Sequence, residues 1–205
     1  MWKPVDTRFY AKRLPVAIAA IDDGGEANFI RTVLEQFNTV TLFHAIGTPG
    51  DFLQVIGQGE ENAPPYLIIS AHGDKGGIIF GEYIEEIDVS SLHDEVMLPE
   101  TIGQAINLPG TVVINTACSA GVEEAGKAFM QGNLKAYIAA DEDVSGEAAA
   151  LFIMHFFHRL IKMESLEEAW QHAAAYDEES RAYRLYVQDG FYQLTPEGQP
   201  SKTTY

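Results

Sequence analysis

The segment Thr111-Val112-Val113-Ile114-Asn115-Thr116-Ala117-Cys118-Ser119-Ala120-Gly121 sets the architecture of this chain, because an apolar run leads directly into a lone cysteine among small residues. A second segment, Tyr66-Leu67-Ile68-Ile69-Ser70-Ala71-His72-Gly73, is built in the same way and leads into a histidine. Apolar runs without polar alternation are typical of strands buried on both faces, as in a parallel sheet. Because parallel strands end at one edge of their sheet, we expect His72 and Cys118 to converge there.

Three further apolar runs of strand length accompany these two, at Val16–Ile21, Val40–Ile46 and Leu134–Ala140. Segments with a helical period of apolar residues alternate with the runs or follow them, at Glu26–Phe37, Glu123–Met130, Ser145–Lys162 and after a capping-box pattern at Ser165–Glu168. This alternation predicts an α/β fold, in which a mostly parallel sheet lies between helices on both of its faces.

The C-terminal part predicts antiparallel pairing. Tyr183–Val187 and Phe191–Leu194 flank Asp189-Gly190, which is a two-residue signal for a β-hairpin. We expect the tail Pro196–Tyr205 to be frayed, and Gly76–Pro109 to be an insertion with one short strand and a helix. Since no linker divides the chain, we expect a single domain over residues 1–205, with a core at about residues 15–194.

Composition excludes several classes of protein. The chain has 205 residues, 13 Lys and Arg against 30 Asp and Glu, and a formal net charge of −17, which disfavours nucleic-acid binding. A single cysteine excludes an internal disulfide and a multi-cysteine zinc site, and fits a reducing, cytoplasmic location. No apolar stretch approaches the ~20 residues of a membrane span, so we expect no membrane association.

Cys118 and His72 suggest nucleophilic catalysis. Small neighbours leave the thiol uncrowded, and its place ahead of a helix favours the thiolate that attacks carbonyl groups. Gly73 permits close backbone approach, so the amides of Gly73 and Cys118 are candidate oxyanion donors. The alternative interpretation is a small buried cysteine and a structural histidine. The two motifs occur together, 46 residues apart, and this conjunction favours catalysis.

The paired motifs resemble those of caspase-like (clan CD) cysteine peptidases, and most of all the CHAT branch, in which one strand ends in His-Gly and another in Ala-Cys-x-Ser-Gly. Here Ala120 replaces the serine of the second motif. The resemblance implies a caspase-like three-layer sandwich closed by a C-terminal β-hairpin. It also implies a catalytic dyad in which Cys118 attacks the scissile carbonyl and His72 protonates the leaving amine. No cofactor, metal or two-chain maturation is implied, and a separate activator or adaptor protein is expected.

The resemblance also points to an S1 pocket, which would bind the P1 residue that precedes the scissile bond. By analogy its candidate residues are Asp22, Asp23, Thr116, Asp141 and Asp143, with Glu142 between the last two. Carboxylates at these positions would complement Arg or Lys, so the expected substrate is a protein or peptide with a basic P1 residue. The alternative is that these acids are solvated loop residues or helix caps.

Other functions remain open at this point. A catalytically inactive caspase-like binding or regulatory module is the main alternative, and a hydrolytic or acyl-transferring enzyme with a different substrate is the second. Gly121–Lys127 fits the first part of a phosphate-binding loop, but Ala128 follows it where Ser or Thr is needed. His155, His158 and His172 lack a metal-binding motif, so we interpret them as structural.

Overall fold

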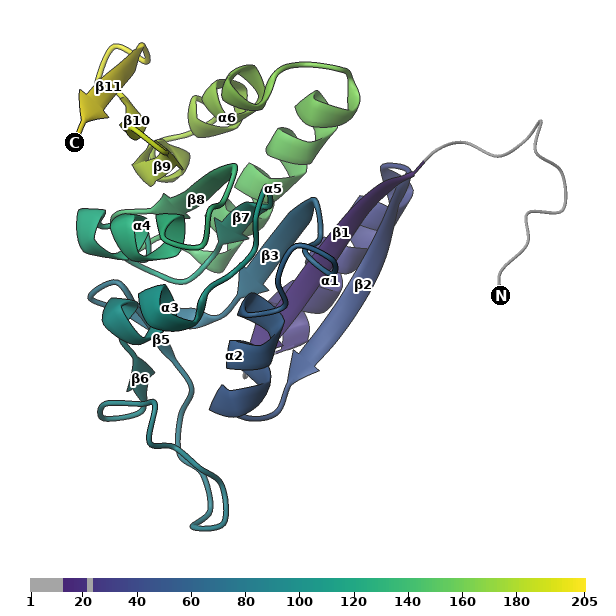
Figure 1. Ribbon diagram of the computed structural model, residues 1–205. Coiled ribbons are helices and arrows are strands. Elements are labelled where there is room, and N and C mark those ends of the chain that lie inside the picture. Colours follow the sequence, from purple (N-terminus) through teal and green to yellow (C-terminus); the bar gives the residue numbers. More distant parts are fainter. Residues whose placement is uncertain (1–12, 22–23) are drawn as a thin grey trace, which may run out of the picture.

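The computed structural model describes residues 13–21 and 24–205, and its centre is an eight-stranded sheet with the strand order β11-β10-β9-β8-β7-β3-β1-β2 (Figure 1). Five of these strands are parallel, which confirms the expected parallel core: β1 (Leu14–Ile21), β2 (Thr39–Ile46), β3 (Tyr66–Ser70), β7 (Val112–Asn115) and β8 (Ala136–Ala140). Every residue of β7 and β8 is buried, as continuous apolar strands require.

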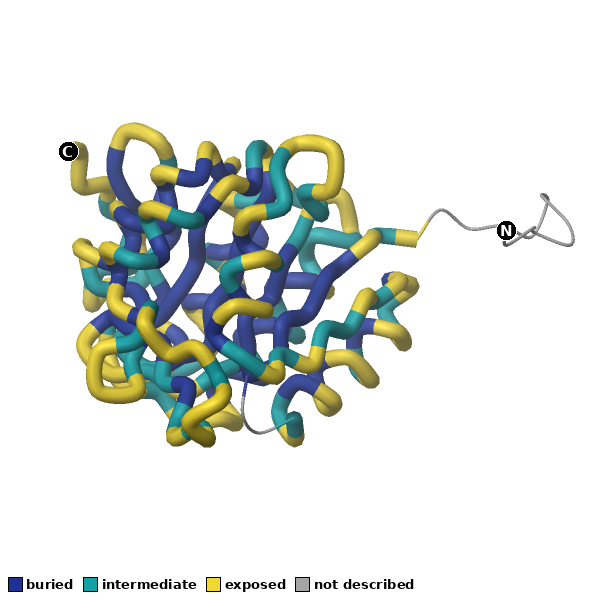
Figure 2. The backbone as a smooth tube through the Cα atoms, turned by 60° about the horizontal axis from the view of Figure 1, so that its bottom comes forward, coloured by how far each residue is buried: buried dark blue, intermediate teal, exposed yellow. Residues whose placement is uncertain are grey.

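Helices cover both faces of the sheet. One apolar cluster packs the sheet against α1 (Gly24–Gln36), α5 (Gly146–Ile161) and α6 (Leu166–Ala174). The other packs it against α2 (Pro49–Ile56), α3 (Pro99–Ala105) and α4 (Glu123–Met130). The layers confirm the three-layer α/β sandwich, and Figure 2 shows the buried strands as a continuous interior beneath exposed loops.

Capping explains where two helices begin. The Ser165 side chain accepts from the Glu168 amide while the Glu168 carboxylate accepts from the Ser165 amide, which is the capping box expected from the sequence. Helix α2 was not expected, although Thr48 caps its first turn and Pro49 opens it. It has only eight residues, so its periodic signal is short.

The segment after β3 forms a second, three-stranded sheet of β4 (His72–Asp74), β5 (Gly77–Ile79) and β6 (Val96–Met97). The expected insertion, Gly76–Pro109, contains the expected helix α3 but two short strands, β5 and β6, rather than one. Figure 1 shows the chain between β5 and β6 projecting at the bottom of the view. The consequence for the site is that His72 begins a hairpin rather than ending the long strand.

The C-terminal hairpin consists of β9 (Tyr183–Val187) and β10 (Gly190–Leu194), after the short 3-10 helix Glu179–Ala182. The expectation of a frayed tail is wrong, because Pro200–Thr204 forms β11, which pairs antiparallel along all of β10. Backbone pairing needs no apolar pattern, and an ion pair between Lys202 and Asp189 fixes the tail from the side. In the part of the chain that the structure describes, no helix is long and apolar enough to cross a membrane.

Candidate active site

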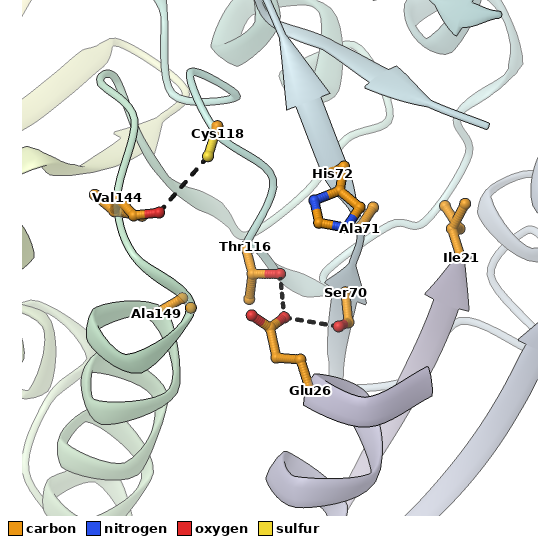
Figure 3. Close-up of a pocket in the computed structure, with 10 residues that line it drawn as sticks. Ile21, Glu26, Ser70, Ala71, His72, Thr116, Cys118, Val144 and Ala149 are labelled. Carbon is orange, nitrogen blue, oxygen red and sulfur yellow. Dashed lines mark hydrogen bonds between the residues drawn. The ribbon is translucent and has the colours of Figure 1, made fainter. Parts of the chain in front are cut away.

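A cavity of about 170 Å³ opens at the carboxyl ends of β1, β3 and β7. Figure 3 shows Cys118 and His72 on neighbouring segments, with Thr116 and Glu26 below them in the view. The residues that line the cavity are Ile21, Glu26, Ser70, Ala71, His72, Thr116, Cys118, Val144, Gly146 and Ala149. The structure therefore brings together the two reactive residues that sequence reasoning placed at one sheet edge.

Cys118 lies in the loop between β7 and α4 and is half-buried. Its thiol donates a hydrogen bond to the Val144 carbonyl, at 3.6 Å from Sγ to O, rather than to His72. The next residue, Ser119, has a φ of 56°, which turns the chain sharply away from the thiol. The Cys118 amide donates to no acceptor among the described residues, so it is free to bind an incoming oxygen.

His72 is exposed at the first position of β4, and the backbone of the following residue touches the cysteine loop. A Cβ atom at Gly73 would lie 2.5 Å from the Cys118 carbonyl oxygen and 2.9 Å from the Ala117 side chain. Only glycine fits this approach. The contact places the amides of Gly73 and Cys118, the two candidate oxyanion donors, on adjoining segments.

Glu26, in the first turn of α1, supplies a carboxylate to the same cavity. Its Oε1 accepts hydrogen bonds from Ser70 Oγ and Thr116 Oγ1, each at 2.7 Å. Its Oε2 accepts no hydrogen bond from a described residue, and no described Lys, Arg or His forms an ion pair with it. A half-buried carboxylate without a cation is a ready binding site for a cationic ligand.

Sequence reasoning missed Glu26, because an acidic residue at the start of a helix is favoured by the helix dipole alone. A signal was nevertheless present. Ser70 and Thr116 are hydroxyl residues at the ends of two neighbouring buried strands, and both are buried. Buried hydroxyl groups need hydrogen-bond partners, so the two residues together indicate a polar group from another element between the ends of these strands.

The other expected S1 residues lie elsewhere. Thr116 lines the cavity, but Asp141 and Asp143 line a separate depression of about 590 Å³ on the far side of Val144. Asp141 is ion-paired with Arg184, and Asp143 accepts a hydrogen bond from Ser119 Oγ at 2.9 Å. Glu142 lines the same depression as these two acids. Asp22 and Asp23 lie outside the described residues.

The Asp141 carboxyl has a structural environment of its own. Burial raises its pKa, and the Arg184 guanidinium opposes that rise. Arg184 also lies over the Phe191 ring, at 4.8 Å from the centroid, so the pair bridges β8 and the C-terminal hairpin. Because Arg184 already forms an ion pair with it, the Asp141 carboxylate is a poor partner for a substrate cation.

The three histidines of α5 and α6 have structural contacts, and His172 lies 3.9 Å from a carboxylate oxygen of Glu164. The His155 ring packs on Tyr176 with 4.0 Å between ring centroids, and the His158 ring lies 5.8 Å from that of Phe37. Among the residues that the structure describes, no group of three His, Cys, Asp or Glu side chains is placed to hold a metal ion.

Comparisons with known proteins give a fold but no sequence relative: no family model and no curated protein matches the chain. Among solved structures, the Arg-specific cysteine proteinase gingipain R is similar with a TM-score of 0.50 and 11% identity, over 81% of this chain and 43% of that one. A complex of the pro- and mature domains of RgpB from Porphyromonas gingivalis matches with a TM-score of 0.49 and 12% identity, over 81% and 44%.

The chain thus spans less than half the length of either solved structure. At 11% identity, the likeness to gingipain R concerns the fold alone. The likeness confirms the caspase-like architecture, a mostly parallel sheet between helices, while membership of the CHAT branch stays a prediction.

Proposed function

We propose that this protein is a cysteine endopeptidase that cleaves peptide bonds after a basic residue. The observation that carries the proposal is a single cavity lined by a thiol, an imidazole and a carboxylate without a cation: Cys118, His72 and Glu26. A buried structural cysteine would not need an imidazole and a free amide at its side.

The chemistry follows from the positions of these groups. His72 takes the thiol proton, and the Cys118 sulfur attacks the scissile carbonyl carbon to form a C–S bond. The carbonyl oxygen becomes an oxyanion that accepts hydrogen bonds from the amides of Gly73 and Cys118. The C–N bond then breaks, and His72 gives its proton to the leaving amine. Water, deprotonated by His72, hydrolyses the thioester, and the proton returns to the sulfur.

Glu26 supports the choice of a basic P1 residue. Two hydroxyl groups hold its Oε1, while Oε2 faces the start of α5, where a Cβ at Gly146 would lie 3.7 Å away. A guanidinium or ammonium group that entered the cavity would pair with the free oxygen in surroundings shielded from water. Arg specificity is a property of gingipain R, whose fold this chain shares. Asp22 and Asp23 remain candidates for the same pocket.

The test is active-site labelling with a peptidyl acyloxymethyl ketone that carries Arg at P1. We expect labelling of the wild-type protein at Cys118, and none of the Cys118→Ala or His72→Ala variants. Labelling by no P1 residue at all would refute the peptidase and favour the binding module. Labelling with Asp but not with Arg at P1 would refute the basic pocket alone.

A matched pair of variants locates the pocket. Glu26→Gln removes the cavity carboxylate, and we expect kcat/KM for a P1 Arg substrate to fall by about 100-fold. Asp143→Asn removes a carboxylate that the structure places outside the cavity, and we expect a change of less than about twofold. A large loss for Asp143→Asn and a small one for Glu26→Gln would show that the S1 pocket lies at the loop after β8 instead.

A further inference from the structure

We infer that Asn115 and Tyr137 are positioning residues, which hold the Cys118 sulfur in place through hydrogen bonds to the backbone on both sides of it. The inference rests on the proposed function, and neither residue has a role in the mechanism proposed above. Asn115 ends β7 and Tyr137 lies on the neighbouring strand β8, and both are fully buried on the sheet side of the cysteine loop.

The two side chains form one chain of three hydrogen bonds. Asn115 Oδ1 accepts from the Ala117 amide at 3.0 Å, just before the cysteine. Asn115 Nδ2 donates to the Tyr137 hydroxyl at 3.2 Å, and that hydroxyl donates to the Ala120 carbonyl at 2.8 Å, just after it. The network therefore closes a clamp around Cys118 and Ser119, and the Tyr137 hydroxyl is used as both donor and acceptor.

The Tyr137 ring has little freedom to move. It stacks on Phe129 with 4.1 Å between ring centroids and 9° between planes. Burial raises the pKa of the Tyr137 hydroxyl above its usual value, so at neutral pH the hydroxyl keeps its proton and remains a donor to Ala120. A rigid donor fixes the loop more closely than water would, because its position is set by packing.

A neighbouring tyrosine provides a matched control. Tyr183, on β9, is as fully buried as Tyr137, and its ring stacks on Phe152 with 3.9 Å between centroids. Its hydroxyl has no hydrogen-bond partner among the described residues. Removal of either hydroxyl by a Tyr→Phe change conserves a buried, stacked ring, but only the change at Tyr137 frees the cysteine loop.

Loss of the clamp should change catalysis in a particular way. The P1 contacts of Glu26 depend on α1, Ser70 and Thr116, and the Tyr137 network shares no hydrogen bond with them. The distance from Cys118 to the scissile carbonyl depends on the loop. Because a small misplacement of a reacting atom costs rate rather than binding, we expect kcat to fall while KM is conserved.

The experiment compares Tyr137→Phe, Tyr183→Phe and the wild-type protein in kcat, KM and the rate of Cys118 carbamidomethylation by iodoacetamide from pH 5 to 9. For Tyr137→Phe we expect kcat to fall by about tenfold or more with KM within about twofold, and an altered pH profile of alkylation. Tyr183→Phe should match the wild type in all three. Equal behaviour of the two variants would overturn the inference.

A second variant, at Asn115, distinguishes loss of this network from a general loss of folded structure. Asn115→Ala breaks the same chain from its other end, and the double variant should lose no more kcat than the worse single variant, because one network is lost only once. Additive losses would mean that the two residues act separately, which also overturns the inference. Alkylation requires no peptide substrate, so the comparison of alkylation rates remains decisive even if neither the wild-type protein nor any variant cleaves peptides.

Discussion

The loop that carries Cys118 and the hairpin that carries His72 meet at one cavity, but they are supported in different ways. The cysteine loop rests on buried side chains of three sheet strands, through Asn115, Tyr137 and the Tyr186 hydroxyl, which donates to the Gly121 carbonyl at 2.6 Å. The histidine hairpin belongs to a small peripheral sheet, and both end residues of β4 are exposed.

The difference suggests a division of labour. In the proposed mechanism the nucleophile must stay within reach of a carbonyl carbon, and the loop of Cys118 is held from beneath by closely packed groups. The imidazole would transfer protons to groups that arrive and leave, and it stands on an exposed strand. The direct brace between the two segments is the backbone approach of Gly73 to Cys118. Glycine substitutions on each side should therefore have unequal effects.

The largest effect is expected at Gly121, where the cysteine loop crosses the sheet. A Cβ atom there would overlap the Ala139 carbonyl, a backbone atom of β8 that cannot move without the sheet. We expect Gly121→Ala to lower the free energy of unfolding by about 3 kcal/mol or more and to abolish labelling of Cys118. Urea denaturation followed by circular dichroism measures the loss.

Gly50→Ala is the control for this change. A Cβ at Gly50 meets only the Thr48 hydroxyl at 3.7 Å, so the helix α2 should be unaffected or gain slightly from alanine. Should Gly121→Ala prove as stable as Gly50→Ala, the loop would be free to shift, and its rigid support by the sheet would be refuted.

Gly73→Ala should have the second largest effect, and it should damage activity more than stability. Its Cβ would press on the Cys118 carbonyl from the side of the peripheral hairpin, which can yield. We expect about 1 to 2 kcal/mol of lost stability but a loss of about 100-fold in kcat/KM, as the dyad and the oxyanion donors separate. Parallel urea melts and peptide kinetics measure the two quantities, and a loss of stability without loss of rate would contradict the brace.

Much of this architecture could be predicted from the sequence because strands buried on both faces consist almost entirely of apolar residues. The strands β1, β3, β7 and β8 are apolar on both faces, so their type and parallel arrangement were evident. Helix α4 has the bounds that its periodicity indicated. The convergence of His72 and Cys118 followed from topology alone, since parallel strands share one carboxyl edge.

The missed features depend on contacts that local patterns do not encode. Strand β11 is polar, and it exists because β10 offers a free edge. Glu26 enters the cavity only through hydroxyl groups 44 and 90 residues away in the chain. Asp141 was expected to share a pocket with Thr116, but it lines a separate depression, where Arg184 reaches it from β9. In each case the residue or strand that makes the contact is distant in sequence, so composition and spacing cannot predict it.

A smaller effect is expected at Ser119, which tests whether the cysteine loop is held in its turn. Its φ of 56° lies in the left-handed region, where glycine is favoured over alanine. The Ser119→Gly and Ser119→Ala variants both lose the hydrogen bond to Asp143, so their difference reports the backbone alone. We expect the glycine variant to be more stable by about 1 kcal/mol in urea melts. Equal stabilities would show that the loop adopts another conformation in solution.

The smallest effect is expected in the histidine hairpin. Lys75 and Gly76 join β4 to β5 with φ values of 48° and 84°, which is the two-residue turn that favours Asn-Gly. Because Asn tolerates the left-handed region better than Lys, Lys75→Asn should stabilise the turn by a few tenths of a kcal/mol, on the order of 0.3. Since the hairpin is peripheral, global unfolding would barely register the change, and amide hydrogen exchange of β4 and β5 is the suitable measurement. Slower exchange there, with no change in the exchange of β7, would show that the two supports are independent. Slower exchange in β7 as well would show that the hairpin and the cysteine loop open together, and the contrast between them would then be false.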